Sequence, residues 1–159
     1  GLRIGVSAAK GLCYAKNKPL IAISTLQSMA FLASKKYSRI LGEHNQSLLF
    51  CPMIDARRME VYSAVYDSEN REKRTIISEI ITEVSYQEWL KDNQMVFFGN
   101  GSHKCNPVIG SSPNAIFDSK ILPEAKGLVL AGQALFTKKD FELQHISIDF
   151  RVIKLVRDE

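Results

Sequence analysis

The chain has 159 residues, of which 45% are hydrophobic and 24% charged, a composition typical of a globular protein with one buried core. No apolar run approaches the ~20 residues of a membrane-spanning helix, so no membrane partner is expected. The net charge of +4 is uneven, because residues 1–60 hold nine Lys/Arg against three Asp/Glu. This basic part faces either an acidic partner or RNA, or it is an ordinary solvated surface, and the pattern favours the ordinary surface.

The three cysteines indicate the chemical setting. Cys13, Cys51 and Cys105 are widely spaced and form no Cys-x-x-Cys pair, which favours a reducing, cytoplasmic location over a disulfide framework. Cys13 and Cys51 lie in apolar runs and are expected to be small core residues. His103 and Cys105 are two potential ligands without a matching second pair, so no metal site is predicted.

The first segment, residues 2–16, is expected to be a helix. Leu2, Val6, Ala9 and Cys13 recur at three- and four-residue spacing. Small side chains along this helix suit either packing inside the chain or a contact with another subunit, and the pattern alone favours internal packing. These small residues are Gly5, Ala8, Ala9, Gly11 and Ala15.

The next segments predict a strand, a helix and a hairpin. Residues 20–23 are apolar and are expected to form a short buried strand. Ser24 precedes Gln27 by three residues, a spacing typical of a helix N-terminus, and the apolar stripe that follows predicts a helix to about residue 38. Apolar and alternating runs at 47–54 and 60–67 then predict a β-hairpin.

The second half is expected to alternate strands and helices. A charged loop at 68–74 leads to a strand at 76–81. Ser85 and Glu88 have capping-box spacing and predict a short helix through Leu90. Further strands are expected at 95–98 and 115–117, with irregular structure at 103–114 and a helix at 124–139 that has Pro123 at its first position. The alternation indicates an α/β class with a mixed sheet.

The tip of the hairpin concentrates charge. Asp55, Arg57, Arg58 and Glu60 fall within six residues and form either an anion-binding or catalytic cluster or a locally paired turn. The local interpretation is favoured for Asp55, which is expected to hold the turn, with Arg57 or Arg58 paired to Asp55 or Glu60. For one of the two arginines, a contact with a partner or RNA is an equally good interpretation, because guanidinium groups bind phosphates and carboxylates in a bidentate manner.

No convergent set of catalytic residues is evident. Gly99-Asn100-Gly101 follows a strand, but it lacks the longer pattern of a dinucleotide loop and the lysine of a P-loop, so a strand-to-helix turn is favoured. No Gly-x-Ser-x-Gly elbow and no His-x-x-x-His pair is present. A binding or scaffold role is therefore favoured over an enzyme acting by itself. The alternative is a hydrolase, peptidase-like or nucleotide-binding enzyme with a phosphate site at residues 99–101 and an acid near Asp55.

Four motifs in register resemble the bacterial TsaB (YeaZ) family. They are the helix at residues 1–12, the segment at residues 19–26, the hairpin with Asp55-Ala56-Arg57-Arg58 followed by Glu60-Val61-Tyr62, and Gly99-Asn100-Gly101. The order and spacing agree over roughly residues 1–140. The resemblance implies an actin-like ATPase fold of the ribonuclease H-like superfamily, N-terminally truncated, in which residues 1–40 are the remnant of a first lobe and residues 41–142 form a second. Residues 143–159 depart from the family's aromatic tail.

The resemblance also implies a function. Such proteins are noncatalytic paralogues that dimerise with the catalytic subunit TsaD, which transfers a threonylcarbamoyl group to a tRNA adenosine beside the anticodon. A TsaE-like ATPase completes the assembly, and a homodimer is an alternative. This chain is expected to need no cofactor or metal of its own, ATP and ADP being used by the wider complex, and to meet tRNA indirectly. The residues implied at the partner interface are Leu2, Gly5, Val6, Ala8, Ala9 and Leu12.

Overall fold

The computed structural model describes residues 2–41 and 48–137. Five strands form one mixed sheet in the order β3-β2-β1-β4-β5. The hairpin β1–β2 and the pair β2–β3 are antiparallel, whereas β4 and β5 join β1 in parallel. The strands are β1 (Leu48–Asp55), β2 (Glu60–Tyr66), β3 (Glu72–Ile80), β4 (Gln94–Phe98) and β5 (Ala115–Asp118).

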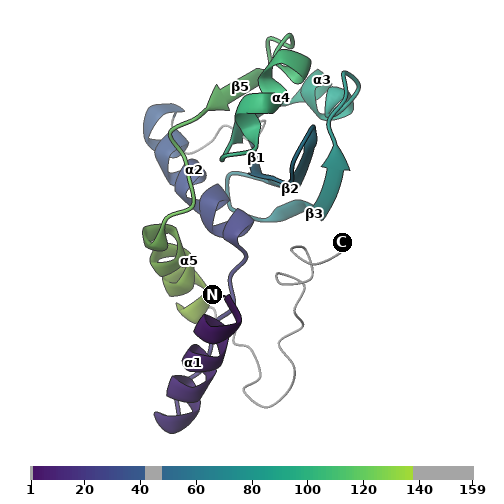
Figure 1. Ribbon diagram of the computed structural model, residues 1–159. Helices are drawn as coiled ribbons and strands as arrows, with labels where there is room; N and C mark the ends of the chain where they lie inside the picture. Colours follow the sequence, from purple (N-terminus) through teal and green to yellow (C-terminus); the bar gives the residue numbers. More distant parts are fainter. Residues whose placement is uncertain (1, 42–47, 138–159) are drawn as a thin grey trace.

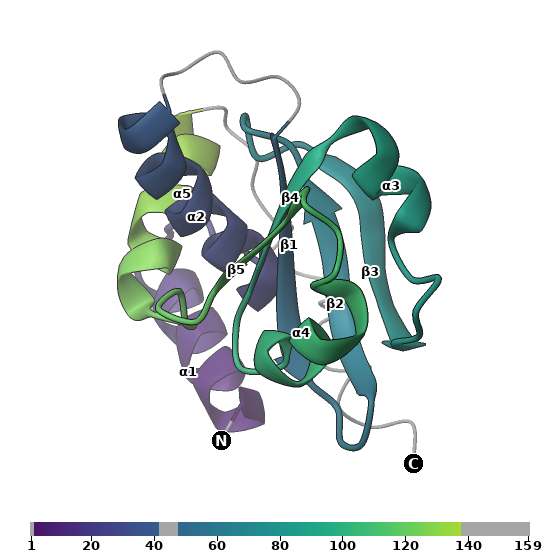
Figure 2. The same ribbon diagram turned by 90° about the horizontal axis from the view of Figure 1, so that it is seen from above.

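Helices cover both faces of the sheet (Figures 1 and 2). Helices α2 and α5 lie on one face, and α3 and α4 lie on the other. Helix α1 extends away from the sheet beyond α5 (Figure 1). The helices are α1 (Leu2–Ala15), α2 (Thr25–Leu41), α3 (Gln87–Asp92), α4 (Ser102–Ile109) and α5 (Ala125–Thr137). None of the described helices is long and apolar enough to cross a membrane.

The central strands are apolar throughout because both faces are covered, as expected where parallel strands lie between helices. Leu49, Cys51 and Met53 of β1 belong to the core under α3 and α4, whereas Leu48 and Phe50 belong to the core under α2. This period of two sends alternate residues to opposite faces. The predicted α/β class, the mixed sheet and the helix at residues 2–16 are confirmed.

Several local predictions are wrong. Residues 20–23 do not form a strand: Leu20 makes an isolated bridge and residues 21–24 have no regular structure, because this segment does not pair into the described sheet. The charged residues 72–74, predicted to be loop, are the start of β3. Pro123 lies two residues before α5 begins at Ala125 rather than at its first position.

The region predicted to be irregular, residues 103–114, contains most of α4. Pro107 lies inside this helix. Cys105 and Ile109 lie four residues apart, so they share a helix face, and both are buried in the core. Burial of that face outweighs the single helical hydrogen bond that proline cannot donate.

The helix α3 lacks the predicted capping box of Ser85 and Glu88. Residue Tyr86 occupies the N-cap position with φ 63° and makes no side-chain cap hydrogen bond. The Ser85 hydroxyl instead accepts a hydrogen bond from the Thr82 backbone N–H at 3.0 Å. The turn before α3 is therefore closed by Thr82 and Ser85, which leaves Tyr86 free to point into the sheet.

The cysteines divide between core and surface. Cys51 and Cys105 are buried as free thiols, and burial raises the pKa of Cys51 to about 12. Cys13 is only half-buried, contrary to the predicted core position, because α1 lies away from the sheet. Within residues 2–41 and 48–137 no cluster of three or more His, Cys, Asp or Glu side chains is placed to hold a metal.

Candidate functional site

The hairpin tip is held by a lysine that the sequence patterns did not single out. Lys104 of α4 reaches across to β1 and β2, where its ammonium group pairs with the Asp55 carboxylate. The same group donates to the backbone carbonyls of Arg57 at 3.2 Å and Glu60 at 2.6 Å. One cation therefore joins both sides of the turn to α4. Because irregular structure was predicted at residues 103–114, Lys104 was not expected to lie on a helix beside the turn.

Asp55 orders the turn, as its position predicted. Its carboxylate accepts a hydrogen bond from the Arg57 backbone N–H at 3.1 Å. The Lys104 ammonium is the main cause that lowers the pKa of Asp55 below its ordinary value of 3.8. A carboxylate that stays ionised and is engaged in this way is a poor general base at neutral pH. Glu60 accepts a hydrogen bond from the Ser78 hydroxyl across the β2–β3 pair.

The two arginines of the tip adopt a backbone conformation that L-residues other than Asn and Asp rarely take. Arg57 has φ 76° and Arg58 has φ 44°. Both side chains are exposed. In the described part of the chain, Arg58 makes no ion pair. Non-glycine residues in the left-handed region cost about 1–2 kcal/mol each, and such strain is typical of positions where the side chain has a role.

Relief of this strain gives a testable prediction. Arg58→Gly is expected to raise the free energy of unfolding by about 0.5–1 kcal/mol, because the relief of strain exceeds the entropy that glycine adds to the unfolded chain. Arg58→Val should lower it, since a β-branched side chain tolerates a positive φ poorly. Urea unfolding of the three proteins measures both effects. Equal midpoints would show that the turn carries no strain at Arg58.

The motif Gly99-Asn100-Gly101 is a tight strand-to-helix turn, as predicted. The Gly101 N–H donates to the Met53 carbonyl at 3.1 Å, and the Ser102 N–H donates to the Gly99 carbonyl at 3.2 Å. The side-chain oxygen of Asn100 accepts from the Asp55 N–H at 3.2 Å. The N–H groups of Gly101 and Ser102 are therefore used within the chain, to hold the turn against β1.

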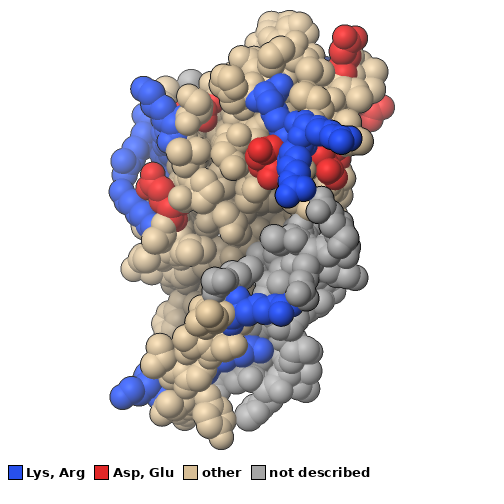
Figure 3. Space-filling view, in the orientation of Figure 1, with Lys and Arg blue, Asp and Glu red and all other residues tan. Residues whose placement is uncertain are grey.

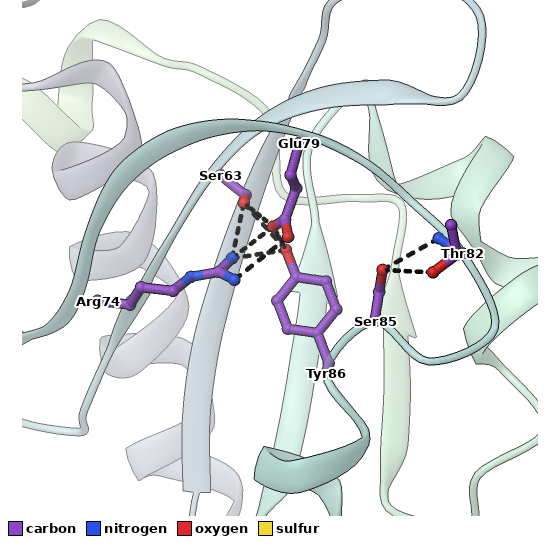
Figure 4. Close-up of polar contacts among 6 residues, drawn as sticks. All are labelled: Ser63, Arg74, Glu79, Thr82, Ser85 and Tyr86. Atoms are coloured by element: carbon purple, nitrogen blue, oxygen red, sulfur yellow. Dashed lines mark hydrogen bonds and ion pairs between the residues drawn. The ribbon is translucent and has the colours of Figure 1, made fainter.

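A second polar cluster lies between β2, β3 and the start of α3 (Figure 4). The Arg74 guanidinium donates to Glu79 at 2.6 Å and to the Tyr86 hydroxyl at 2.8 Å. Ser63 donates to Glu79 at 2.7 Å, and Tyr86 also donates to Glu79. Burial is the main cause that raises the pKa of Tyr86. These four side chains bind one another and link β3 to the start of α3, which is a structural role.

The predicted interface residues of α1 differ in their exposure to solvent. Gly5, Ala8 and Leu12 are exposed and follow one another at three- and four-residue spacing, so they share one face. Val6 and Ala9 are half-buried. The side chain of Leu2 lies outside the described part of the structure. The predicted tail at 143–159 lies outside it as well.

Residues 1–139 match the model of the family described as TsaD: tRNA N6-adenosine threonylcarbamoyltransferase. The chain belongs to the TsaD family. The match runs over every described helix and strand. It therefore includes the hairpin tip, the glycine turn and α1.

Known relatives place the chain with the TsaB (YeaZ) members of the TsaD family. It is 30% identical over 105 residues to the tRNA threonylcarbamoyladenosine biosynthesis protein TsaB of Bacillus subtilis (strain 168), over 63% of this chain and 41% of the relative. The chain thus spans less than half the length of that relative. The resemblance that the sequence motifs suggested is confirmed.

Solved structures agree on the fold. A Pseudomonas aeruginosa protein with similarity to peptidase YeaZ superposes with a TM-score of 0.62 at 23% identity, over 92% of this chain and 65% of that one. YeaZ from Pseudomonas aeruginosa superposes with a TM-score of 0.60 at 23% identity, over 91% of this chain and 64% of that one. The fold is accordingly the actin-like ATPase fold of the TsaD family, as expected.

Proposed function

We propose that this TsaD-family chain is a noncatalytic, TsaB-like partner subunit in the biosynthesis of threonylcarbamoyladenosine in tRNA. It binds a TsaD-type catalytic subunit, which transfers the threonylcarbamoyl group to the tRNA adenosine, and the assembly also recruits a TsaE-type ATPase. The observation that carries the proposal is the pairing of a family match over residues 1–139 with motif residues engaged in structural contacts. Asp55 is bound by Lys104, and the glycine turn is tied to β1 by the Gly101 N–H, which donates to Met53, and by Asn100, which accepts from the Asp55 N–H.

Helix α1 supports a partner role because its composition has no explanation within the described chain. A methyl group added at Gly5 or at Gly11 would meet no atom within 4 Å. Each glycine costs a helix about 1 kcal/mol relative to alanine. Glycines in a helix interior allow the backbone of another element to come close. A second helix docked on the face of Gly5, Ala8 and Leu12 would use the space beside Gly5.

Exposed apolar side chains on the same helix also favour a partner. Ile4 is 76% exposed, Leu12 is 66% exposed and Tyr14 is 71% exposed. Several large apolar side chains on one short exposed helix are unusual for a surface that meets only water. The helix contains no acidic residue. The expected partner surface is therefore apolar at its centre.

Binding to a TsaD-type subunit tests the proposal. The chain is expected to bind that subunit in calorimetry, and Ala8→Arg should weaken binding at least tenfold, because a long charged side chain would separate the two helices. Gln87→Arg is the matched control, since it adds the same charge to an exposed helical position on α3, away from α1.

Two results would overturn the proposal. One is failure of the unmodified chain to bind the subunit. The other is equal weakening by Gln87→Arg and Ala8→Arg, which would show that the loss follows net charge rather than the surface of α1. Circular dichroism of each variant confirms that α1 remains helical.

A further inference from the structure

A group of cations on α2 is left unexplained by the proposed function. Lys35 and Arg39 are exposed on α2 and Lys120 is exposed after β5, while the Lys36 side chain is 40% exposed. We call Lys35, Lys36, Arg39 and Lys120 the α2 basic patch. Residues 2–41 hold seven Lys/Arg and no Asp/Glu. On the left of the view, Figure 3 shows Lys and Arg side chains with Asp and Glu side chains beside them.

Asp118 at the end of β5 brings the patch together. Its carboxylate pairs with the Lys36 ammonium and accepts a hydrogen bond from the Lys120 backbone N–H at 3.0 Å. The Tyr37 hydroxyl donates to the same carboxylate at 3.3 Å. Lys120 is thereby anchored beside α2.

The charges of the patch do not cancel. Burial alone would raise the pKa of Asp118, but the hydrogen bonds from Lys36 and Lys120 hold it below its ordinary value of 3.8, so Asp118 stays ionised. It offsets the charge of Lys36. Within residues 2–41 and 48–137, Lys35 and Arg39, which lie one helical turn apart, and Lys120 make no ion pair.

The chemistry of the patch fits phosphates better than it fits a protein surface. Its aromatic neighbours lie beneath cations: the Lys35 ammonium is 5.6 Å from the centre of the Phe31 ring, and the Lys36 ammonium is 5.8 Å from that of Tyr37. Protein interfaces are built around buried aromatic anchors and are depleted in lysine. Contacts to a nucleic-acid backbone are made by lysine and arginine without such anchors.

We propose that the α2 basic patch binds the phosphate backbone of RNA directly and without sequence preference. This goes beyond the proposed function, in which the chain meets tRNA only through its partner. The two proposals are independent, because the patch lies on α2 and just after β5, whereas the partner face lies on α1.

The dependence of binding on salt tests the patch. Fluorescence anisotropy with an unmodified tRNA transcript should show that the logarithm of the association constant of the full chain falls with the logarithm of salt concentration. The double variant Lys35→Gln/Arg39→Gln is expected to reduce that slope by about two and to weaken binding about tenfold at low salt. The double variant Lys73→Gln/Lys91→Gln removes the same net charge from β3 and α3 and should change the slope little.

Three results would contradict the proposal. Equal losses of tRNA affinity in both double variants would mean that binding depends on net charge rather than on the patch. Absence of salt-dependent binding by the full chain would exclude RNA contact. If polyglutamate binds as tightly as tRNA, and if the Lys35→Gln/Arg39→Gln variant loses this binding, the partner of the patch is an acidic protein. Ala8→Arg should not weaken tRNA binding, because it adds a cation outside the patch, so failure here is distinct from failure of the partner subunit proposal.

Discussion

Gly99→Ala is expected to lower the free energy of unfolding by about 3–5 kcal/mol, which is a large fraction of the total for a domain of this size. Gly99 has φ 98°, a backbone conformation that residues with a Cβ atom rarely adopt. A methyl group there would overlap the Met53 carbonyl oxygen and lie 2.8 Å from the Met29 side chain. The oxygen belongs to β1 and cannot rotate away, so the turn and the strand must separate.

The same substitution in α1 is the control for Gly99. Gly11→Ala meets no atom within 4 Å and should stabilise the helix by up to about 1 kcal/mol. Thermal unfolding followed by circular dichroism measures both variants. A midpoint for Gly99→Ala equal to that of the unmodified chain would refute the account of this turn.

Glu79→Ala is expected to lower the free energy of unfolding by about 3 kcal/mol, because it leaves the Arg74 charge without its carboxylate. The Arg74 and Glu79 side chains are only 21% and 20% exposed. Arg74 Nε already lacks a hydrogen-bond partner and is shielded from solvent. Loss of Glu79 also removes the acceptor for Ser63 and Tyr86 (Figure 4).

An exposed ion pair provides the matched control for Glu79. The Glu69 carboxylate lies 3.1 Å from the Arg71 guanidinium, but the Glu69 side chain is 68% exposed. Glu69→Ala should therefore lower the free energy of unfolding by less than about 1 kcal/mol. Urea unfolding at neutral pH compares the two. If Glu79→Ala and Glu69→Ala lower the free energy of unfolding by similar amounts, the cluster of Arg74, Glu79, Ser63 and Tyr86 stabilises the fold no more than a surface ion pair does.

Hydrophobic periodicity predicted the elements that pack by regular patterns. The stripe of α2, the alternating β2 strand and the apolar β1 strand all lie where their spacing indicates. The errors arose where tertiary contacts outweigh local signals. Pro107 suggested irregular structure, yet burial of Cys105 and Ile109 keeps α4 helical.

The candidate site was predicted only in part. Asp55 at the turn follows from the hairpin pattern. The lysine that binds it, Lys104, is 49 residues away in the chain and is brought close only by the parallel pairing of β4 with β1. The contact of Arg74 with Tyr86 likewise depends on how β3 meets α3. No local sequence signal reports such register-dependent contacts.

Amide hydrogen exchange on the chain, alone and with a TsaD-type subunit, tests the central claim most directly. A partner docked on α1 should slow exchange across residues 2–15, which are largely exposed in the chain alone. The hairpin tip at residues 55–60 serves as the internal comparison. Protection concentrated in α1 is the predicted result. Protection confined to the tip, or unchanged exchange throughout α1, would contradict the assignment of α1 as the partner helix.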